Sequence, residues 1–151
     1  MEKNNTLPVS AWSGYAPESM IRELLLAMAE LRPSRLLDPE VVRRDAQGQF
    51  LLAGKGAGEE APAVIRSLGA TSYTLLMGVP LVGDQLPSIP PRKCSRALDA
   101  LLHRCLSADP RLRPTWEELA REAAALEVPR RLKGEFVPEM ADDSFWKEEM
   151  L

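Results

Sequence analysis

Apolar side chains recur with the 3.6-residue period of an α-helix in four stretches of this chain. The stretches cover residues 17–31, about 62–78, about 94–107 and about 115–126. In each, apolar side chains such as Leu, Ile, Val, Met or Ala gather on one side of the helix. The pattern therefore predicts four amphipathic helices packed around one apolar core.

Residues that start and stop helices bound three of these stretches. Pro17 suits the first helical position of the first stretch, and Pro33 ends it because proline cannot continue a helix. Gly78 suits the end of the second stretch. Thr115 and Glu118 form a Thr-x-x-Glu capping box at the start of the fourth. These signals agree with the apolar period and fix the helix order.

The remaining segments predict little regular structure apart from one hairpin. Residues 41–52 contain two β-compatible runs around a Gly-containing turn, which is typical of a β-hairpin. Residues 79–93 are rich in proline and predict an extended connector. Residues 1–16 are polar, with Trp12 and Tyr15 as candidate anchors onto the body. The expected fold class is mainly α (α+β), a helical bundle with one small β-hairpin.

The composition is that of one ordinary soluble domain. The chain has 151 residues, of which 45% are hydrophobic and 27% charged. Residues 1–126 carry 15 basic and 15 acidic side chains and residues 127–151 carry 4 and 7, so the formal charge of −3 arises in residues 127–151. A neutral body without clustered Lys and Arg predicts no nucleic-acid binding. We divide the chain into a lead-in (1–16), a domain (17–128) and an acidic tail (129–151).

Two cysteines and one histidine are the residues to test for disulfide or metal chemistry. Cys94 and Cys105, if they share a helix, lie about 16 Å apart, beyond the reach of a disulfide. His103 would then lie on nearly the opposite face from Cys105, which disfavours zinc. We expect reduced thiols and no metal.

The N-terminal residues lack a signal-peptide core, and the longest apolar run, Leu24–Ala29, cannot span a membrane, so we expect no membrane partner and a cytoplasmic location.

Two segments resemble the C-terminal lobe of eukaryotic-type protein kinases. Residues 105–119, Cys-Leu-Ser-Ala-Asp-Pro-Arg-Leu-Arg-Pro-Thr-Trp-Glu-Glu-Leu, are similar to the Cys-Leu-x-x-Asp-Pro-x-x-Arg-Pro-Thr segment near the end of the kinase domain. Residues 65–81 contain Ser-Leu-Gly and Leu-Leu-Met-Gly-Val-Pro, similar to the central helix of that lobe. More weakly, Leu31–Leu37 resembles the catalytic loop, and 41–52 the strand pair after it. The resemblance implies a kinase-like C-lobe without an N-lobe.

The resemblance also implies that the phosphoryl-transfer groups are missing. Kinases need a catalytic Asp, an Asn and a second Asp that hold Mg²⁺, and a Lys that positions the phosphates. Aligned on Pro33, the catalytic Asp position holds Glu30, and the Asn position holds Arg35 or Glu40. The metal-binding Asp falls within Gly54–Gly56. We therefore expect no catalytic residue and no cofactor.

A kinase C-lobe without catalytic groups is similar to the non-catalytic C-lobe (KIND-type) domains, which are protein-interaction modules. This resemblance implies a pseudokinase-like scaffold that binds another protein where the missing lobe or activation loop would otherwise cover the core. The alternative is an enzyme, either a fragment of a Ser/Thr protein kinase or an atypical nucleotide binder, completed by an N-lobe on another chain. A third alternative is the folded part of a larger regulator.

The same resemblance implies structural roles for residues of the two motifs. In kinases the arginine that matches Arg113 pairs with a glutamate, so we expect an ion pair from Arg113 to Glu59 or Glu60. Gly69 is expected to let another backbone approach closely. The further structural positions are Asp109, Pro114, Thr115, Glu118 and Ser67.

The acidic tail mixes aromatic side chains with carboxylates. Phe136, Phe145 and Trp146 are candidate partner-binding residues, because aromatic side chains act as anchors when a short peptide docks. The alternative is that the tail folds back and covers the chain's own core. Composition does not decide between the two.

Overall fold

The computed structural model describes residues 6–81 and 94–126. In these ranges the α-helices are α1 (Glu18–Leu31), α2 (Ala61–Met77), α3 (Arg96–Cys105) and α4 (Trp116–Ala125). The strands are β1 (Thr6–Pro8), β2 (Val42–Asp45) and β3 (Phe50–Leu52), and two 3₁₀ helices are η2 (Val9–Trp12) and η3 (Pro110–Leu112). The predicted α+β class is confirmed.

All four predicted helices are present, and local chemistry sets their ends. Pro17 is the N-cap of α1 instead of its first helical residue, and Arg32 ends the helix in the left-handed conformation with a φ of 48°. α2 ends at Gly78, whose φ of 84° costs a glycine little. Thr115 and Glu118 make both bonds of the capping box at the start of α4.

The sheet has one strand more than the sequence predicts. β2 and β3 form the predicted antiparallel hairpin, and β1 joins the other edge of β2 to give the order β1-β2-β3. Arg43 fastens the added strand, because its guanidinium donates to the Thr6 hydroxyl at 2.9 Å and to the Thr6 carbonyl at 3.1 Å. The single-hairpin prediction was wrong, since a three-residue strand shows no alternation of its own.

Residues 6–16 pack into the same core as the helices. Trp12 is only 6% exposed, whereas Tyr15, the second candidate anchor, is 57% exposed. The backbone N–H groups of Gly14 and Ala16 both donate to the Leu75 carbonyl, at 2.8 and 3.3 Å. The lead-in is therefore fastened to the C-terminal part of α2, with Trp12 and not Tyr15 as its buried aromatic residue.

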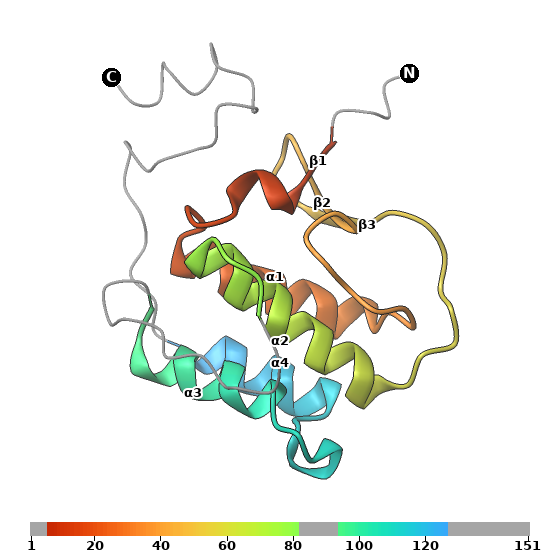
Figure 1. The fold of residues 1–151 in the computed structure, drawn as a ribbon, viewed down its shortest axis with the longest axis vertical. Helices are drawn as coiled ribbons and strands as arrows, with labels where there is room; N and C mark the ends of the chain where they lie inside the picture. The colour runs from red at the N-terminus through yellow and green to blue at the C-terminus, as the bar shows by residue number, and fades with distance from the viewer. Residues whose placement is uncertain (1–5, 82–93, 127–151) are drawn as a thin grey trace.

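The elements stack in three layers, with the sheet above α1 and α2, and with α3 and α4 below (Figure 1). The main core lies between the helices. Fully buried side chains contribute roughly 1.5–3 kcal/mol each to folding. The largest of them are Met20, Ile21, Leu24, Leu25, Met28, Ile65, Leu68, Leu75, Leu76, Leu98, Leu102 and Leu106.

α1 and α4 pack against each other in opposite directions. Arg22, near the start of α1, donates to the carbonyls of Ala123 at 3.0 Å and Ala124 at 3.1 Å in the last turn of α4, and the Ala123 carbonyl also accepts from the Leu126 N–H at 3.2 Å. At the other end of the pair, Arg32 lies 2.9 Å from Glu117. The Arg32–Glu117 ion pair is largely exposed and adds little stability, so Arg22 is the contact that fixes this pairing.

α3 is shorter than the predicted 94–107 helix. It begins at Arg96 because Ser95 caps it, the hydroxyl accepting from the Leu98 N–H at 3.2 Å. The Ser95 N–H donates to a Glu18 carboxylate oxygen at 2.7 Å, which ties the start of α3 to that of α1. Most of the predicted connector, 82–93, lies outside the described residues.

Among the residues that the structure describes, no helix combines the length and apolar character needed to cross a membrane.

Candidate partner-binding groove

A groove of about 410 Å³ lies between α1 and the turn of the β2–β3 hairpin. Its α1 side uses positions three or four residues apart, which share one helix face. Leu31 is 51% exposed there, while Phe50 is nearly buried on the hairpin side. The lining residues are Glu23, Ala27, Glu30, Leu31, Gly48, Gln49 and Phe50.

Hydrogen bonds within the turn hold the hairpin side of the groove. The Asp45 carboxylate accepts from the backbone N–H groups of Gln47 at 2.9 Å and Gln49 at 2.8 Å. Gly48 adopts a φ of 87°, a conformation that favours glycine, and its carbonyl accepts from Arg44 Nε at 3.2 Å. The turn is thus fixed from both sides before any partner binds.

The two carboxylates of the groove differ in their surroundings. Arg44 lies over the rings of Trp12 and Phe50, 5.7 and 5.3 Å from their centroids, and its guanidinium is 3.6 Å from Glu23. Glu30 is exposed and, within residues 6–81 and 94–126, makes no hydrogen bond or ion pair through its side chain. The groove therefore combines apolar surface with one compensated and one uncompensated negative charge.

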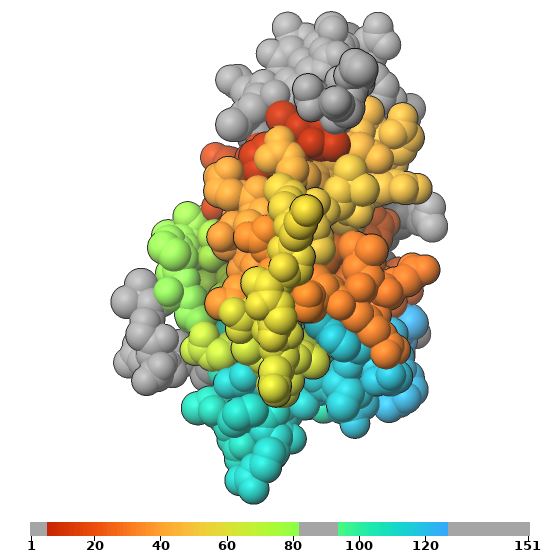
Figure 2. Space-filling view, turned by 90° about the vertical axis from the view of Figure 1, so that its right-hand side faces the viewer, coloured from red at the N-terminus to blue at the C-terminus, as the bar shows by residue number. Residues whose placement is uncertain are grey.

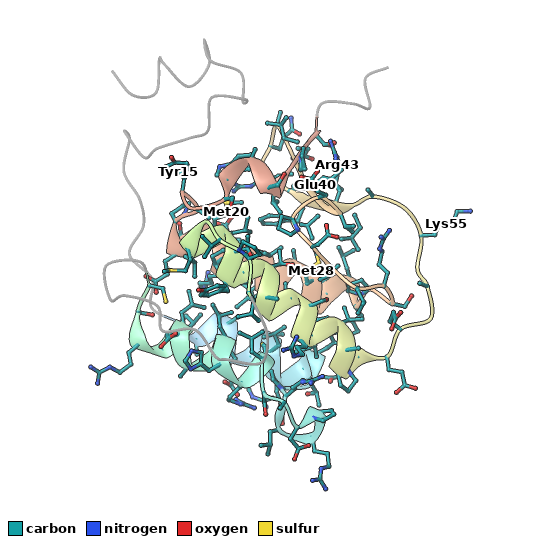
Figure 3. All side chains as sticks on the ribbon, in the orientation of Figure 1. Tyr15, Met20, Met28, Glu40, Arg43 and Lys55 are labelled. Atoms are coloured by element: carbon teal, nitrogen blue, oxygen red, sulfur yellow. The ribbon has the colours of Figure 1, made fainter. Side chains whose placement is uncertain are left out.

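The residues aligned with the kinase catalytic groups lie on separate elements. Glu30 is in the last turn of α1. Arg35 follows that helix and donates from Nη1 to the Ala53 carbonyl at 2.7 Å. Glu40 is exposed just before β2, and Lys55 points away from the body of the protein (Figure 3). Of these residues, only Glu30 lines the groove.

The 53–60 loop is fastened along one face of the molecule, where it is seen in yellow (Figure 2). The backbone N–H groups of Ala57 and Glu59 both donate to the Ser34 carbonyl, at 2.9 and 2.8 Å. These bonds tie the loop to the segment that follows α1. The loop is thereby held against residues far from it in the chain, which the sequence pattern does not indicate.

The expected ion pair from Arg113 to Glu59 or Glu60 is not formed. Arg113 instead donates from Nη1 to the Pro62 carbonyl and from Nε to the Ser107 carbonyl, both at 2.8 Å. Its guanidinium therefore joins the start of α2 to the end of α3 through backbone oxygens. The two glutamates are exposed, and the loop bonds to Ser34 set their position independently of Arg113.

Ser67 and Gly69 bring α2 close to two other segments. The Ser67 hydroxyl accepts from the Leu37 N–H at 2.8 Å and donates to the Val64 carbonyl at 2.6 Å. A Cβ atom added to Gly69 would lie 2.9 Å from the Cβ atom of Cys105. The close approach at Gly69 therefore involves a side chain of α3, where the sequence led us to expect backbone.

The other motif residues organise the turn from η3 to α4. The Asp109 carboxylate accepts from the backbone and guanidinium N–H groups of Arg111, which lowers the pKa of Asp109. Pro114 is buried. Thr115 Oγ1 accepts from the Glu118 N–H at 3.1 Å, and a Glu118 carboxylate oxygen accepts from the Thr115 N–H at 3.0 Å.

Cys94 and Cys105 are buried free thiols, in agreement with the prediction. Burial raises the pKa of Cys105 to about 12, and burial followed by the charges of Asp99 and Glu18 raises that of Cys94 to about 12. Thiols that stay protonated are poor nucleophiles and poor metal ligands. His103 lies 3.5 Å from Asp99 on the same helix. Across the described ranges, no three His, Cys, Asp or Glu side chains are arranged to hold a metal ion.

The sequence pattern does not reveal the hairpin side of the groove. Gly48, Gln49 and Phe50 show only turn and strand preferences, and nothing local places them beside α1. One signal on α1 is present, because Ala27 places a small apolar residue between Glu23 and Glu30 on the otherwise charged face. That interruption is compatible with a second contact surface.

The tail candidates Phe136, Phe145 and Trp146 lie outside the described residues.

No family model matches the chain, and no curated protein matches its sequence. A functional inference for this chain therefore depends on its own residues.

Proposed function

We propose that this chain is a catalytically inactive protein-interaction module, similar in fold to a kinase C-lobe, whose partner binds in the groove between α1 and the β2–β3 hairpin. The observation that carries the proposal is that one groove combines exposed Leu31 with the Glu30 carboxylate, which pairs with no described residue. Contiguous apolar surface beside charged residues is typical of protein-binding sites.

The groove favours a partner segment that carries an apolar side chain next to Lys or Arg. The apolar side chain would cover Leu31, which is 51% exposed, and removing apolar surface from water contributes roughly 25 cal/mol per Å². The cation would pair with Glu30, whose charge no described residue compensates. The Glu23–Arg44 pair at the other side of the groove would disfavour a second cation there.

The hairpin side of the groove is ordered before binding, which supports a docking role. The Asp45 bonds fix the turn, and Arg44 is held between Trp12, Phe50 and the Gly48 carbonyl. A preformed surface loses little conformational entropy when a partner docks. The same rigidity keeps Phe50 in place at the edge of the groove.

The proposal assigns Glu30 to binding and not to proton transfer. In a kinase the catalytic carboxylate works together with magnesium ligands and a phosphate-positioning lysine. The Asn position is taken by Arg35, which is committed to the Ala53 carbonyl, or by Glu40, and Gly54–Gly56 supplies no carboxylate. Glu30 alone can attract a cation but lacks those partners.

Substitution of Leu31 by Glu tests the groove. We expect Leu31→Glu to reduce partner recovery at least about ten-fold, equivalent to about 1.4 kcal/mol of binding free energy, in affinity capture from cell extract quantified by mass spectrometry. Leu112→Glu is the matched control, because Leu112 is 61% exposed on η3 and does not line the groove. Equal recovery of every bound protein with the two variants would remove the groove from the proposal.

Titration with ATP and Mg²⁺ separates this function from the nucleotide-binding alternative. We expect the melting temperature of the full chain to stay unchanged. A nucleotide at about 100 times its dissociation constant would stabilise a binding protein by about 2.7 kcal/mol. A clear, saturable rise in melting temperature would therefore favour the kinase-fragment alternative over an inactive module.

A further inference from the structure

We propose that Arg66 and Arg113 together form a binding site for an oxyanion, the phosphate or carboxylate group of a ligand. The site lies at the start of α2, on a different set of residues from the α1–hairpin groove. It is independent of the proposed interaction at that groove, so either proposal can fail without the other.

The Arg113 guanidinium contacts the first turn of α2, the turn that precedes Arg66. Arg113 Nη1 donates to the Pro62 carbonyl oxygen at 2.8 Å, which places the guanidinium against this turn. Pro62 and Arg66 are four residues apart on α2 and so share one helix face. Long side chains on a helix lean toward its N-terminus, which favours an Arg66 side chain directed toward the turn that Arg113 contacts.

Both guanidinium groups keep donors for a ligand. A guanidinium has five N–H donors, and the two hydrogen bonds of Arg113 use one from Nη1 and the one from Nε. Arg66 makes no hydrogen bond or ion pair with any residue of the described ranges. Both arginines are half-buried, and neither has a nitrogen among the fully buried polar atoms without a partner that the described residues contain.

Among the described residues no carboxylate forms an ion pair with either arginine, although the charge of Asp109 acts on Arg113 from a longer distance. The Asp109 carboxylate is bound by Arg111, with contacts at 3.0, 3.2 and 3.1 Å. Glu59 and Glu60 form no ion pair with Arg113. The pKa of Arg113 is lowered, first by burial and then by the positive charge of Arg66, while the negative charge of Asp109 opposes this shift.

An oxyanion would offset this repulsion with suitable geometry. Planar guanidinium groups match the paired oxygens of phosphate and carboxylate, and two of them can hold one anion from two sides. The positive end of the 17-residue α2 adds to the attraction. The chemistry therefore selects an anionic group over a neutral or cationic one.

Thermal unfolding of the full chain in phosphate and in chloride at equal ionic strength tests the site. Phosphate at about ten times its dissociation constant would raise the ratio of folded to unfolded protein about eleven-fold. We expect Arg66→Gln to remove most of this gain. Arg66→Gln is the variant of choice because Arg66 makes no hydrogen bond with the described residues, whereas Arg113 also joins two backbone segments.

Arg121→Gln, on the exposed side of α4, is the matched control for the loss of one charge and should keep the phosphate response. A response that is equal in wild type and Arg66→Gln identifies an adventitious ion only and overturns the proposal. The absence of a response in wild type overturns it too. Arg66→Lys, which keeps the charge but not the planar fork, should retain part of the response.

Two small probes distinguish the sources of the anionic group. Acetyl-phosphoserine amide represents a phosphorylated side chain, and acetyl-glutamate amide represents an acidic one. Stabilisation by either probe that is lost in Arg66→Gln supports the site and identifies its ligand class. A response to inorganic phosphate with none to either probe would again indicate an adventitious ion only, and would overturn the proposal.

Discussion

Gly69 lies where α2 meets α3, and its missing side chain sets how closely the two helices approach. A Cβ atom there would lie 2.9 Å from Cys105 Cβ and 3.2 Å from Leu106 Cγ. We expect Gly69→Ala to lower the free energy of unfolding by about 1–3 kcal/mol through overpacking. The crowding has to outweigh the gain of roughly 1 kcal/mol that alanine brings to a helix interior. Urea denaturation followed by circular dichroism measures the net effect.

Ala70→Gly provides the comparison for Gly69→Ala at the next position of the same helix. Ala70 is half-buried, and its replacement by glycine should cost roughly 1 kcal/mol of helix propensity. If Gly69→Ala stabilises the protein by as much as Ala70→Gly destabilises it, helix propensity alone explains the change in stability at both positions. The close-contact explanation for Gly69 would then be wrong.

Cys105 makes stability depend on pH in the alkaline range. Burial raises its pKa from 9.0 to about 12, so the folded protein keeps the thiol proton after the unfolded chain has released it. The unfolded state then binds fewer protons, and the free energy of unfolding falls as the pH rises between 9 and about 12. We expect this one thiol to lower the free energy of unfolding by about 1.4 kcal/mol when the pH rises from 8 to 10.

Cys105→Ala separates this thiol from the other groups that titrate above pH 8. Urea denaturation of both proteins at pH 8 and pH 10 gives two differences in unfolding free energy. The wild-type protein should lose about 1.4 kcal/mol more than the variant. Identical losses would mean that the buried thiol ionises alike in the folded and unfolded states.

Arg113 illustrates what sequence reasoning can and cannot give for a single residue. Its role as a structural anchor follows from the kinase-like motif, but the expected partners Glu59 and Glu60 were wrong. The loop that carries them is fixed by hydrogen bonds from Ala57 and Glu59 to the Ser34 carbonyl. Backbone contacts of this kind depend on loop position and not on side-chain type, so the sequence does not encode them locally.

The capping box is the element-scale feature that the sequence predicts most directly. Thr115 and Glu118 satisfy two backbone N–H groups at the start of α4, as the Thr-x-x-Glu pattern requires. We expect Thr115→Ala to lower the free energy of unfolding by about 1 kcal/mol, measured by urea denaturation. The cost arises because the Glu118 N–H loses its acceptor.

Thr115→Ser keeps the hydroxyl and is the control for the cap. It should retain stability within about 0.5 kcal/mol, because serine and threonine cap helices comparably. A loss in Thr115→Ser as large as that in Thr115→Ala would assign the effect to the lost methyl group. The hydrogen bond to Glu118 would then contribute little.

Helices could be predicted from the sequence because each has a periodic apolar pattern or a capping residue. A strand could not be predicted where it pairs with residues far away in the chain. α1 and α2 follow from apolar spacing that ends at Pro33 and Gly78. β1 has three residues and pairs with β2 more than thirty positions away, so neither an alternation of apolar and polar residues nor a connecting turn predicts it. The groove has the same origin, since it forms only when the hairpin turn lies beside α1.

At the scale of the whole molecule, residues 6–16 contribute to both the sheet and the core beneath it. β1 extends the sheet, and Trp12 lies beneath it in the core. Arg44 then contacts Trp12 and Phe50 while it approaches Glu23 at the groove. The lead-in thus supports both the core and the residues that line the groove.

Trp12→Ala tests this dependence. Truncating a buried tryptophan costs about 3–5 kcal/mol, a large part of the 5–15 kcal/mol typical of a folded domain. Tyr15→Ala is the matched control in the same segment, and its 57% exposure predicts a loss below about 1 kcal/mol. Urea denaturation of the two variants, followed by circular dichroism, compares the losses. Similar small losses would mean that the helices fold without the lead-in, whereas the expected gap makes residues 6–16 part of the cooperative unit.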